Sequence, residues 1–478
     1  MRIVLVNTNR ISPPVAPVGL DYVAEALAAS GHRTEILDLC WEKRWEQAVA
    51  ASLRGGEIGL VGVSVRNTDD CSFATRESFL PEVASMVACL RKHTAAPIVL
   101  GGVGFSIMPE AVLAQCGADA GIRGEGEFPL ADLAGRLAEN RPWDDLPALL
   151  VRRGGTWRRN PVWFRSLADL PPMSRGFLDN RRYFREGGQA GVETKRGCPR
   201  RCIYCADPVA KGKRVRVRPP AAVADELARL VAMGIDHVHT CDSEFNIPEG
   251  HALAVCREIV RRGFGRRLRW YAYCAPVPFT AELADLMRRA GCSGINFGAD
   301  SGDDRMLALL RRAHRAEDIL RTVRLCREAG ITVMLDLLIG APGETRESIV
   351  RTVSRMKEAD PDRVGVSVGV RVYPGTELVR MIAETDGKKG LVGGEDLSRP
   401  VFFLEPDIAP FVYGLLEELT QGDSRFLFFD PARPERNYNY NANRILSEAI
   451  RAGYRGAYWD ILRRRMPPGS PGRPGCAP

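Results

Sequence analysis

The chain has 478 residues, 45% of them apolar, and a net charge of +8. This length is more than one ordinary core supports, so we expect two or three domains. No apolar run is long enough for a membrane span, and Met1–Asn7 turns polar too soon for a signal peptide. The 13 cysteines are mostly isolated and form no disulfide framework, which indicates a reducing compartment, the cytoplasm.

Residues 1–140 alternate short β-prone runs with amphipathic segments. This alternation predicts an α/β domain with a parallel, doubly wound, flavodoxin-like (Rossmann-type) sheet. The strands are expected at Ile3–Asn7, Thr34–Leu39, Ile58–Val65, Pro97–Gly101 and Ala118–Ile122. In such sheets, ligands bind at the carboxyl ends of the strands.

Polar residues and glycines gather at those predicted strand ends. Glycines there let a backbone approach a large flat or phosphate-bearing ligand closely. The candidates are Asn9, Ser64, Arg66, Asn67, Gly101, Gly102, Gly124, Glu125, Gly126 and Glu127. The alternative is a domain that merely packs against its neighbour.

Residues 141–190 are rich in Arg, Trp and Pro and are expected to form a linker. Strand–helix alternation resumes over residues 191–375. The strands are expected at Gly191–Gly197, His237–Ser243, Trp270–Ala275, Gly294–Ser301, Thr332–Gly340 and Val364–Pro374. Polar residues at strand carboxyl ends are typical of a barrel active site. They are Asp242, Glu244, Asn246, Asp300, Ser301, Gly340 and Arg371.

Three cysteines follow the first of these strands. Cys198, Cys202 and Cys205 have C-x3-C-x2-C spacing, with Tyr204 just before the last. Thiolates this close can converge on one soft metal centre. They are one short of the four ligands that usually hold a [4Fe–4S] cluster, which would leave one iron open for a ligand that is not protein. The alternative is structural zinc, but the next histidines, from His237, are too far along the chain for the same loop.

Basic residues surround the cysteine loop. They are Lys195, Arg196, Arg200, Arg201, Lys211, Lys213, Arg214, Arg216 and Arg218. This charge indicates a positive rim for anionic cofactors or for an acidic reductant, or simply a solvated loop. No aromatic-interleaved motif accompanies it, so we do not expect a nucleic-acid partner.

The last hundred residues differ in character. Residues 376–466 are expected to form a mainly helical C-terminal domain, and residues 467–478 a disordered tail. Tyr438 and Tyr440 offer phenol donors to a substrate. The alternative is that these aromatic residues pack on the barrel.

The cysteine motif, with the glycine-bearing strand ends upstream of it, resembles the cobalamin (B12)-dependent radical S-adenosylmethionine (SAM) enzymes. The resemblance implies a B12-binding domain at residues 1–140, a partial (β/α)6 barrel at 191–375, and cobalamin, SAM and a [4Fe–4S] cluster as cofactors. It implies SAM contacts near Asp242, Glu244 and Asn246 and in Gly298–Ser301, where Asp300 replaces the family's Glu. Gly340–Glu344 resembles the segment beside adenine, although a helix first-turn carboxylate is the alternative for Glu344.

The activity that the resemblance implies is methylation of an unactivated carbon, or a phosphinate, of a small molecule, with flavodoxin or ferredoxin as electron donor. A non-methylating cyclisation, ring contraction or oxidation stays open, as does a B12-binding sensor. No Asp-x-His-x-x-Gly motif supplies a cobalt ligand. Arg66 falls where a tryptophan-methylating member of the family sets an arginine beneath the corrin. The alternative is that Arg66 pairs with Asp69 or Asp70.

Overall fold

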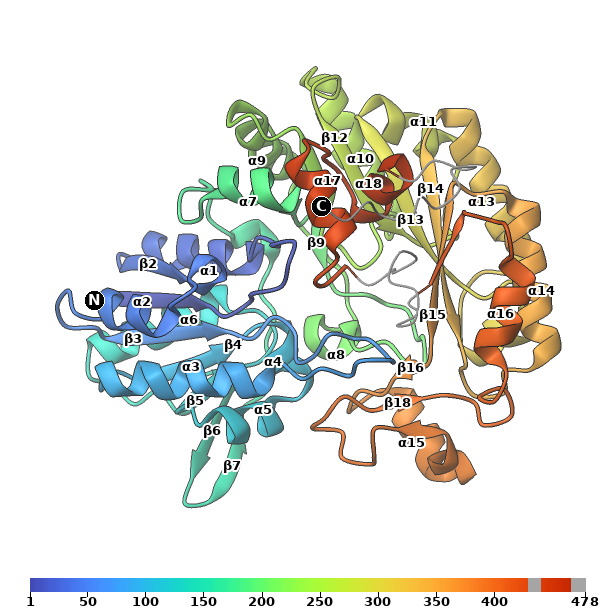
Figure 1. Cartoon of the computed structure of the whole chain (residues 1–478). Helices are drawn as coiled ribbons and strands as arrows, with labels where there is room; N and C mark the ends of the chain where they lie inside the picture. Colours follow the sequence, from blue (N-terminus) through green and yellow to red (C-terminus); the bar gives the residue numbers. More distant parts are fainter. Residues whose placement is uncertain (429–439, 466–478) are drawn as a thin grey trace, which may run out of the picture.

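The computed structural model describes residues 1–428 and 440–465. A sheet domain built from the N-terminal part of the chain lies beside a larger barrel (Figure 1). Short C-terminal helices pack over the barrel. Tyr438 and the predicted tail lie outside the described residues.

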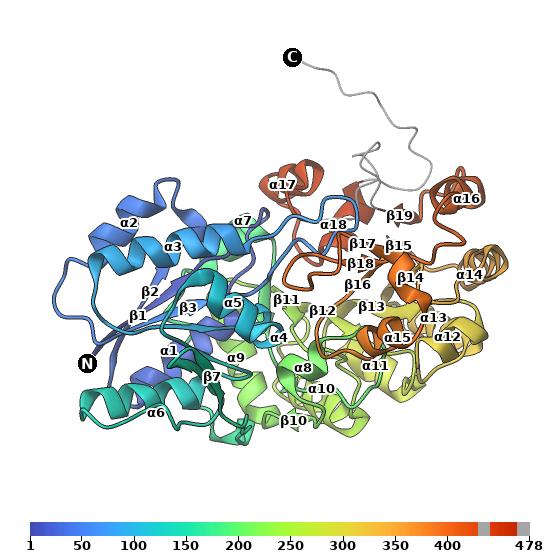
Figure 2. The same ribbon diagram turned by 90° about the horizontal axis from the view of Figure 1, so that it is seen from below.

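The N-terminal domain is a doubly wound sheet of seven strands in the order β2-β1-β3-β4-β5-β6-β7. Its parallel strands are β1 (Arg2–Asn7), β2 (Arg33–Asp38), β3 (Leu60–Ser64), β4 (Ile98–Gly101) and β5 (Ala120–Ile122). These confirm the five predicted strands to within two residues at either end. The helices are α1 (Val18–Ala29), α2 (Trp45–Ser52), α3 (Leu80–His93), α4 (Val103–Ile107), α5 (Pro109–Cys116) and α6 (Glu127–Ala138). Helices α1 and α6 cover one face and α2, α3 and α5 the other (Figure 2), which is why β1, β3, β4 and β5 are mostly apolar. The edge strand β2 is less buried and carries charged residues.

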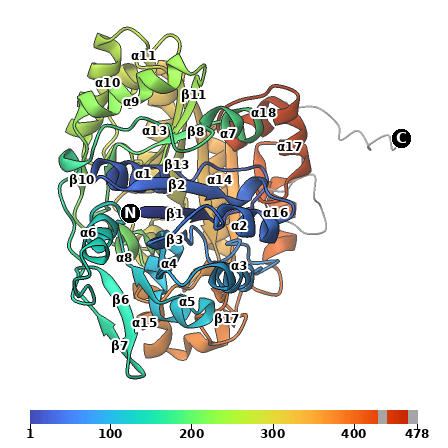
Figure 3. The same cartoon turned by 90° about the vertical axis from the view of Figure 1, so that its left-hand side faces the viewer.

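The domain extends past residue 140, where the sequence analysis set its end. Strands β6 (Leu149–Arg153) and β7 (Thr156–Arg159) form an antiparallel hairpin that pairs with β5 and projects from the sheet (Figure 3). Gly154 and Gly155 form the two-residue turn with φ of 56° and 83°, the combination that hairpin turns favour. The predicted linker therefore begins after Arg159, and it contains α7 (Asn180–Gly187).

The barrel sheet has seven parallel strands in the order β19-β15-β14-β13-β12-β11-β8. They are β8 (Ala190–Val192), β11 (His237–Thr240), β12 (Arg269–Cys274), β13 (Cys292–Asp300), β14 (Thr332–Ile339), β15 (Arg363–Val368) and β19 (Phe426–Phe428). Helices α9 (Pro220–Ala232), α10 (Glu249–Arg261), α11 (Ala281–Arg289), α12 (Asp304–Leu309), α13 (Ala316–Ala329), α14 (Arg346–Ala359) and α16 (Val412–Thr420) accompany it. The first predicted strand breaks after Val192, and its continuation, β9 (Lys195–Arg196), pairs instead with β10 (Arg216–Val217).

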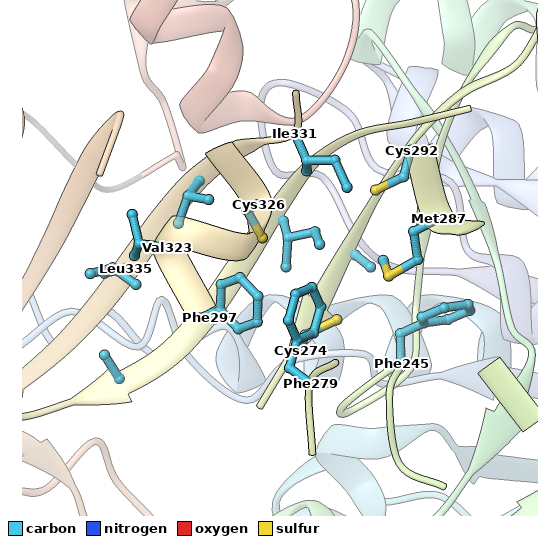
Figure 4. Packing of buried hydrophobic residues seen from close by; sticks show 14 of the residues in the cluster. Phe245, Cys274, Phe279, Met287, Cys292, Phe297, Val323, Cys326, Ile331 and Leu335 are labelled. Atoms are coloured by element: carbon cyan, nitrogen blue, oxygen red, sulfur yellow. The ribbon is translucent and has the colours of Figure 1, made fainter. Parts of the chain in front are cut away.

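An extended apolar core fills the space between the barrel sheet and its helices (Figure 4). Phe279 and Phe297 meet edge to face with ring centroids 5.1 Å apart. Full burial of one such side chain contributes about 1.5–3 kcal/mol. Cys274, Cys292 and Cys326 are fully buried in the same core as free thiols. They act as small apolar residues and are separate from the cysteine loop.

The C-terminal region is mainly helical, as predicted, but it is not a separate body. Its helices are α15 (Glu377–Glu384), α17 (Arg444–Arg451) and α18 (Tyr458–Arg465), besides α16. It supplies β19 to the barrel sheet, and β17 (Leu391–Val392) and β18 (Phe402–Phe403) form a small sheet with β16 (Val370–Arg371). Among the described residues, no helix is both long and apolar enough to cross a membrane.

Candidate active site

A cavity of about 770 Å³ lies between the two sheets. The carboxyl ends of β3, β4 and β5 form one wall, and β8, β11 and β12 of the barrel another. The predicted residues that line it are Ser64, Arg66, Asn67, Gly101, Gly102, Gly124, Glu125, Gly126, Glu127, Asp242 and Tyr440. The structure therefore brings the predicted strand ends of the N-terminal domain together in one site.

Two adjacent glycines shape the N-terminal wall of the cavity. A Cβ added to Gly101 would come no closer than 4.0 Å to another residue's atoms, at the carbonyl oxygen of Ile122, so glycine keeps this wall open. Gly102 has a φ of 99°, and a Cβ there would lie 2.6 Å from the carbonyl oxygen of Val65. The wall can therefore receive a large flat ligand at close range.

Several buried polar atoms at or beside the cavity have no hydrogen-bond partner among the described residues. Gln189 Oε1, Thr240 Oγ1 and Trp459 Nε1 belong to residues that line the cavity, and Asn9 Nδ2 lies in the loop after β1. An unsatisfied buried group costs about 1–3 kcal/mol. These atoms fit a site that is completed by bound ligands.

Arg66 is half-buried and makes no ion pair within the described part of the chain. Asp69 instead pairs with Arg371 at 2.8 Å, and Asp70 accepts hydrogen bonds from its own loop. Burial raises the pKa of the Tyr458 phenol across the cavity, and the charge of Arg66 opposes that rise. The guanidinium therefore faces the cavity and not the two aspartates.

The three cysteines of the loop, Cys198, Cys202 and Cys205, are here called the cluster cysteines. The side chain of Arg312 donates a hydrogen bond to the Cys202 sulfur at 3.0 Å, and the backbone at Arg200 and at Asp207 lowers the pKa of the Cys198 and Cys205 thiols, respectively. Burial is the largest effect on these thiols and raises the pKa of all three. No three His, Cys, Asp or Glu side chains of the described chain are arranged to hold a single ion. A [4Fe–4S] cluster is larger than a single ion, and its cysteine ligands lie farther apart. The hydrogen bond from Arg312 would stabilise a negatively charged thiolate at Cys202.

Two of the predicted SAM contacts lie beside the cluster cysteines. Burial raises the pKa of Glu244 to about 7, and Arg312 is the strongest opposing charge. Asp300 accepts a short hydrogen bond from the Tyr204 hydroxyl and pairs with Arg312 at 3.2 Å. These groups are close to the sulfurs but do not line the large cavity.

The other predicted contacts are already occupied by protein partners. Asp242 accepts from the backbone of Thr194 and Lys195, and Asn246 bonds three backbone groups between residues 275 and 278. The side chains of Ser301 and Arg371 also bond to protein groups, and Gly340 has no side chain. Ser301 bonds Thr352, Arg371 bonds Asp69 and three carbonyl groups, and the Gly340 N–H donates to Glu344.

Glu125 and Glu127 line the cavity, but both are engaged by arginines. Nη2 of Arg196, two residues before Cys198, lies 2.6 Å from Glu127 and 2.7 Å from Glu193. Arg216 pairs with Glu125 at 2.5 Å. This buried charge cluster ties the cysteine loop to the β5–α6 loop of the N-terminal domain.

Sequence reasoning missed the aromatic wall on the barrel side. It consists of His239, Tyr273, Tyr458 and Trp459, in addition to the predicted Tyr440. His239 and Tyr273 lie with ring centroids 5.0 Å apart, and Tyr440 meets Tyr458 edge to face at 5.4 Å. No signal in the sequence singled out these side chains, because burial along β11 and β12 does not alternate.

Comparisons with known proteins match both halves of the chain. A family model for the B12 binding domain matches residues 4–134, and one for the radical SAM superfamily matches residues 192–356. Tryptophan 2-C-methyltransferase of Streptomyces laurentii is 33% identical over 97% of this chain and 96% of that protein.

Solved structures agree with these matches. The radical SAM methyltransferase TsrM of Kitasatospora setae, with tryptophan substrate and a SAM analogue bound, has a TM-score of 0.86 and 32% identity over 97% of both chains. The same protein with cobalamin and a [4Fe–4S] cluster bound has a TM-score of 0.87 and 30% identity over 97% of both chains.

Proposed function

This chain belongs to the cobalamin-dependent radical SAM methyltransferases, and on that basis we propose that its methyl acceptor is tryptophan or a closely related indole. Its cofactors are cobalamin, SAM and a [4Fe–4S] cluster, and the family decides against the sensor and against non-methylating chemistry. When bound, these cofactors supply the methyl carrier, the methyl donor and the low-potential electron centre. Two relatives at about one-third identity support this substrate, since one is named a tryptophan 2-C-methyltransferase and the other has tryptophan bound.

The observation that carries the proposal is the aromatic wall of the cavity. An indole is flat and apolar with one N–H donor, and the rings of Tyr273, Tyr458 and Trp459 offer faces and edges for stacking. The amino and carboxylate groups of tryptophan need hydrogen-bond acceptors and donors. Thr240 Oγ1 and Trp459 Nε1 both lack a partner among the described residues and belong to residues that line the cavity. Tyr440 offers a hydroxyl on the same wall.

The cofactor contacts proposed from the sequence divide into two groups. Residues that line the cavity or lie beside it are proposed to hold cobalamin, with Arg66 beneath the corrin. They are Asn9, Ser64, Arg66, Asn67, Gly101, Gly102, Gly124 and Gly126. Tyr204, Glu244 and Asp300 are proposed to position SAM beside the cluster cysteines. The remaining predicted contacts already bond to other protein groups, and we propose that they hold the cofactor-binding loops in place. They are Glu125, Glu127, Asp242, Asn246, Ser301, Gly340 and Arg371.

We further propose a cytoplasmic enzyme whose electron donor is an acidic flavodoxin or ferredoxin. All twelve cysteines in the described residues are free thiols, as a reducing compartment requires. Arg201, Lys213 and Arg214 are exposed around the cysteine loop without ion-pair partners among the described residues. Their charges would steer an acidic partner, so cluster reduction by flavodoxin should slow as salt is raised, while reduction by dithionite should not follow the same dependence.

The substrate is tested with the anaerobically reconstituted enzyme, cobalamin and SAM labelled with a trideuteromethyl group. The expected result is label in an indole product when tryptophan is supplied, detected by mass spectrometry. Indole-free amino acids such as phenylalanine serve as the control. Methylation of cobalamin without transfer to tryptophan or any indole would reject the substrate and leave the enzyme class intact.

A further inference from the structure

Arg312 reaches the cluster cysteines from a distant part of the sequence. It follows α12, 110 residues beyond Cys202, yet its Nη1 lies 3.0 Å from the Cys202 sulfur. The side chain is only 7% exposed. Among the described residues, it is the one charged side chain with a hydrogen bond to a cluster cysteine sulfur.

The guanidinium is held in one orientation by several partners. Nη2 donates to the carbonyl oxygen of Gly298 at 2.5 Å, and Nε lies 3.2 Å from the Asp300 carboxylate. Nη1 also lies 3.5 Å from the Tyr204 hydroxyl. Because these partners fix the planar guanidinium, its charge is held against the Cys202 sulfur. The flexible ammonium group of a lysine would not be held in this way.

The backbone at Asp300 is built for this contact. The register of β13 shifts between Gly298 and Asp300, and Asp300 has a φ of 61°, in the left-handed region. A non-glycine residue persists in that conformation only where surrounding contacts enforce it. The bulge re-aims the carboxylate so that it meets both Arg312 and Tyr204.

We propose that Arg312 is a positioning residue that raises the reduction potential of the iron–sulfur cluster by holding a permanent positive charge and a hydrogen bond against the Cys202 sulfur. Reduction adds one electron and no proton, so it increases the negative charge beside the guanidinium. A buried cation stabilises the reduced form more than the oxidised form, and hydrogen bonds to the sulfurs act in the same direction. Asp300 opposes this effect by neutralising part of the charge. The inference rests on the cluster site proposed above.

The test is a potentiometric titration of reconstituted protein, with dithionite as the one-electron donor and EPR of the reduced cluster as the signal. Arg312→Gln should lower the midpoint potential enough to change the ratio of reduced to oxidised cluster at least tenfold, which is about 59 mV for one electron. Arg312→Lys keeps the positive charge but loses the planar guanidinium, so its midpoint potential should lie between those of the wild type and Arg312→Gln. Asp300→Asn should move the potential in the opposite direction. Arg214→Gln, the same change at an exposed position near the loop, is the control and should leave the potential unchanged.

Iron analysis separates this inference from the cluster site itself. Wild-type protein that holds no cluster iron would reject the cluster site and, with it, the role of Arg312. An Arg312→Gln variant with full iron and the wild-type potential would overturn the inference. If Arg312→Gln fails to hold iron, the Asp300→Asn variant decides. A midpoint potential that is more positive than wild type supports the inference, and one that is unchanged or more negative overturns it.

Discussion

The buried cluster around Arg196 allows a quantitative test of how the two halves of the enzyme are joined. Arg196→Met keeps an unbranched side chain of similar length and removes the charge. Glu127 and Glu193 then lose the guanidinium at 2.6 and 2.7 Å, whereas Glu125 keeps Arg216 at 2.5 Å. Removing one partner of a buried ion pair costs about 3–5 kcal/mol, because the remaining charges stay buried without compensation.

The measurement is the free energy of unfolding from urea denaturation, followed by circular dichroism. Glu127→Gln and the double variant complete a mutant cycle, and we expect a coupling energy of about 0.5–3 kcal/mol between Arg196 and Glu127. Arg201→Met removes an exposed charge from the same loop and should change stability by no more than about 0.5 kcal/mol. If Arg196→Met were as stable as Arg201→Met and the coupling energy were zero, the charge cluster would not join the domains.

Four further outcomes follow from the site. Replacing all three cluster cysteines with Ala should remove the iron and leave cobalamin bound, by metal analysis and visible absorption; retained iron would reject the assignment. Arg66→Ala should shift the cobalt midpoint potential, and nitrogen splitting from an axial imidazole in the EPR spectrum of the cob(II)alamin form would exclude an arginine beneath the corrin. Tyr440→Phe should reduce turnover while stability falls by no more than about 1.5 kcal/mol, and equal losses in both would indicate packing. Burial raises the pKa of Glu344 from 4.5 to about 7, so the folded state holds this proton more tightly and stability should fall by ~3 kcal/mol as pH rises from 4.5 to 7; a Glu344→Gln variant with the same pH profile would contradict this.

Local patterns predicted the parts of this enzyme that depend on neighbours in sequence. The central strands of the N-terminal sheet are short apolar runs between polar loops, and the cluster cysteines lie within one loop, so local sequence was enough to predict both. The β6–β7 hairpin was missed because exposed arginines at the end of β6 and in β7 mask the signal of Gly154 and Gly155.

Long-range contacts set the limit of that prediction. Arg312 and Arg196 resemble many other arginines in the chain until the fold brings them to Cys202 and Glu127. Asp242 illustrates a different limit, because its polar side chain at a strand end lines the cavity and also holds the backbone at Thr194. A polar residue at the carboxyl end of a strand has two possible uses, and only the tertiary contacts separate them.

The C-terminal helices close the cavity against the first loop of the chain. The backbone N–H of Ala442 donates to the Ser12 carbonyl at 2.7 Å, and Tyr458 reaches the carbonyl oxygen of Pro14 at 3.5 Å. During translation the cavity therefore lacks one wall until Tyr440 to Trp459 have been made, and the more than 400 residues before them take tens of seconds at about 5–20 residues per second. The wall made by the N-terminal domain is complete long before then. A ligand as large as cobalamin accordingly has its widest entrance while the protein is still being synthesised, and chains that end before Ala442 should bind and release it faster than the full chain.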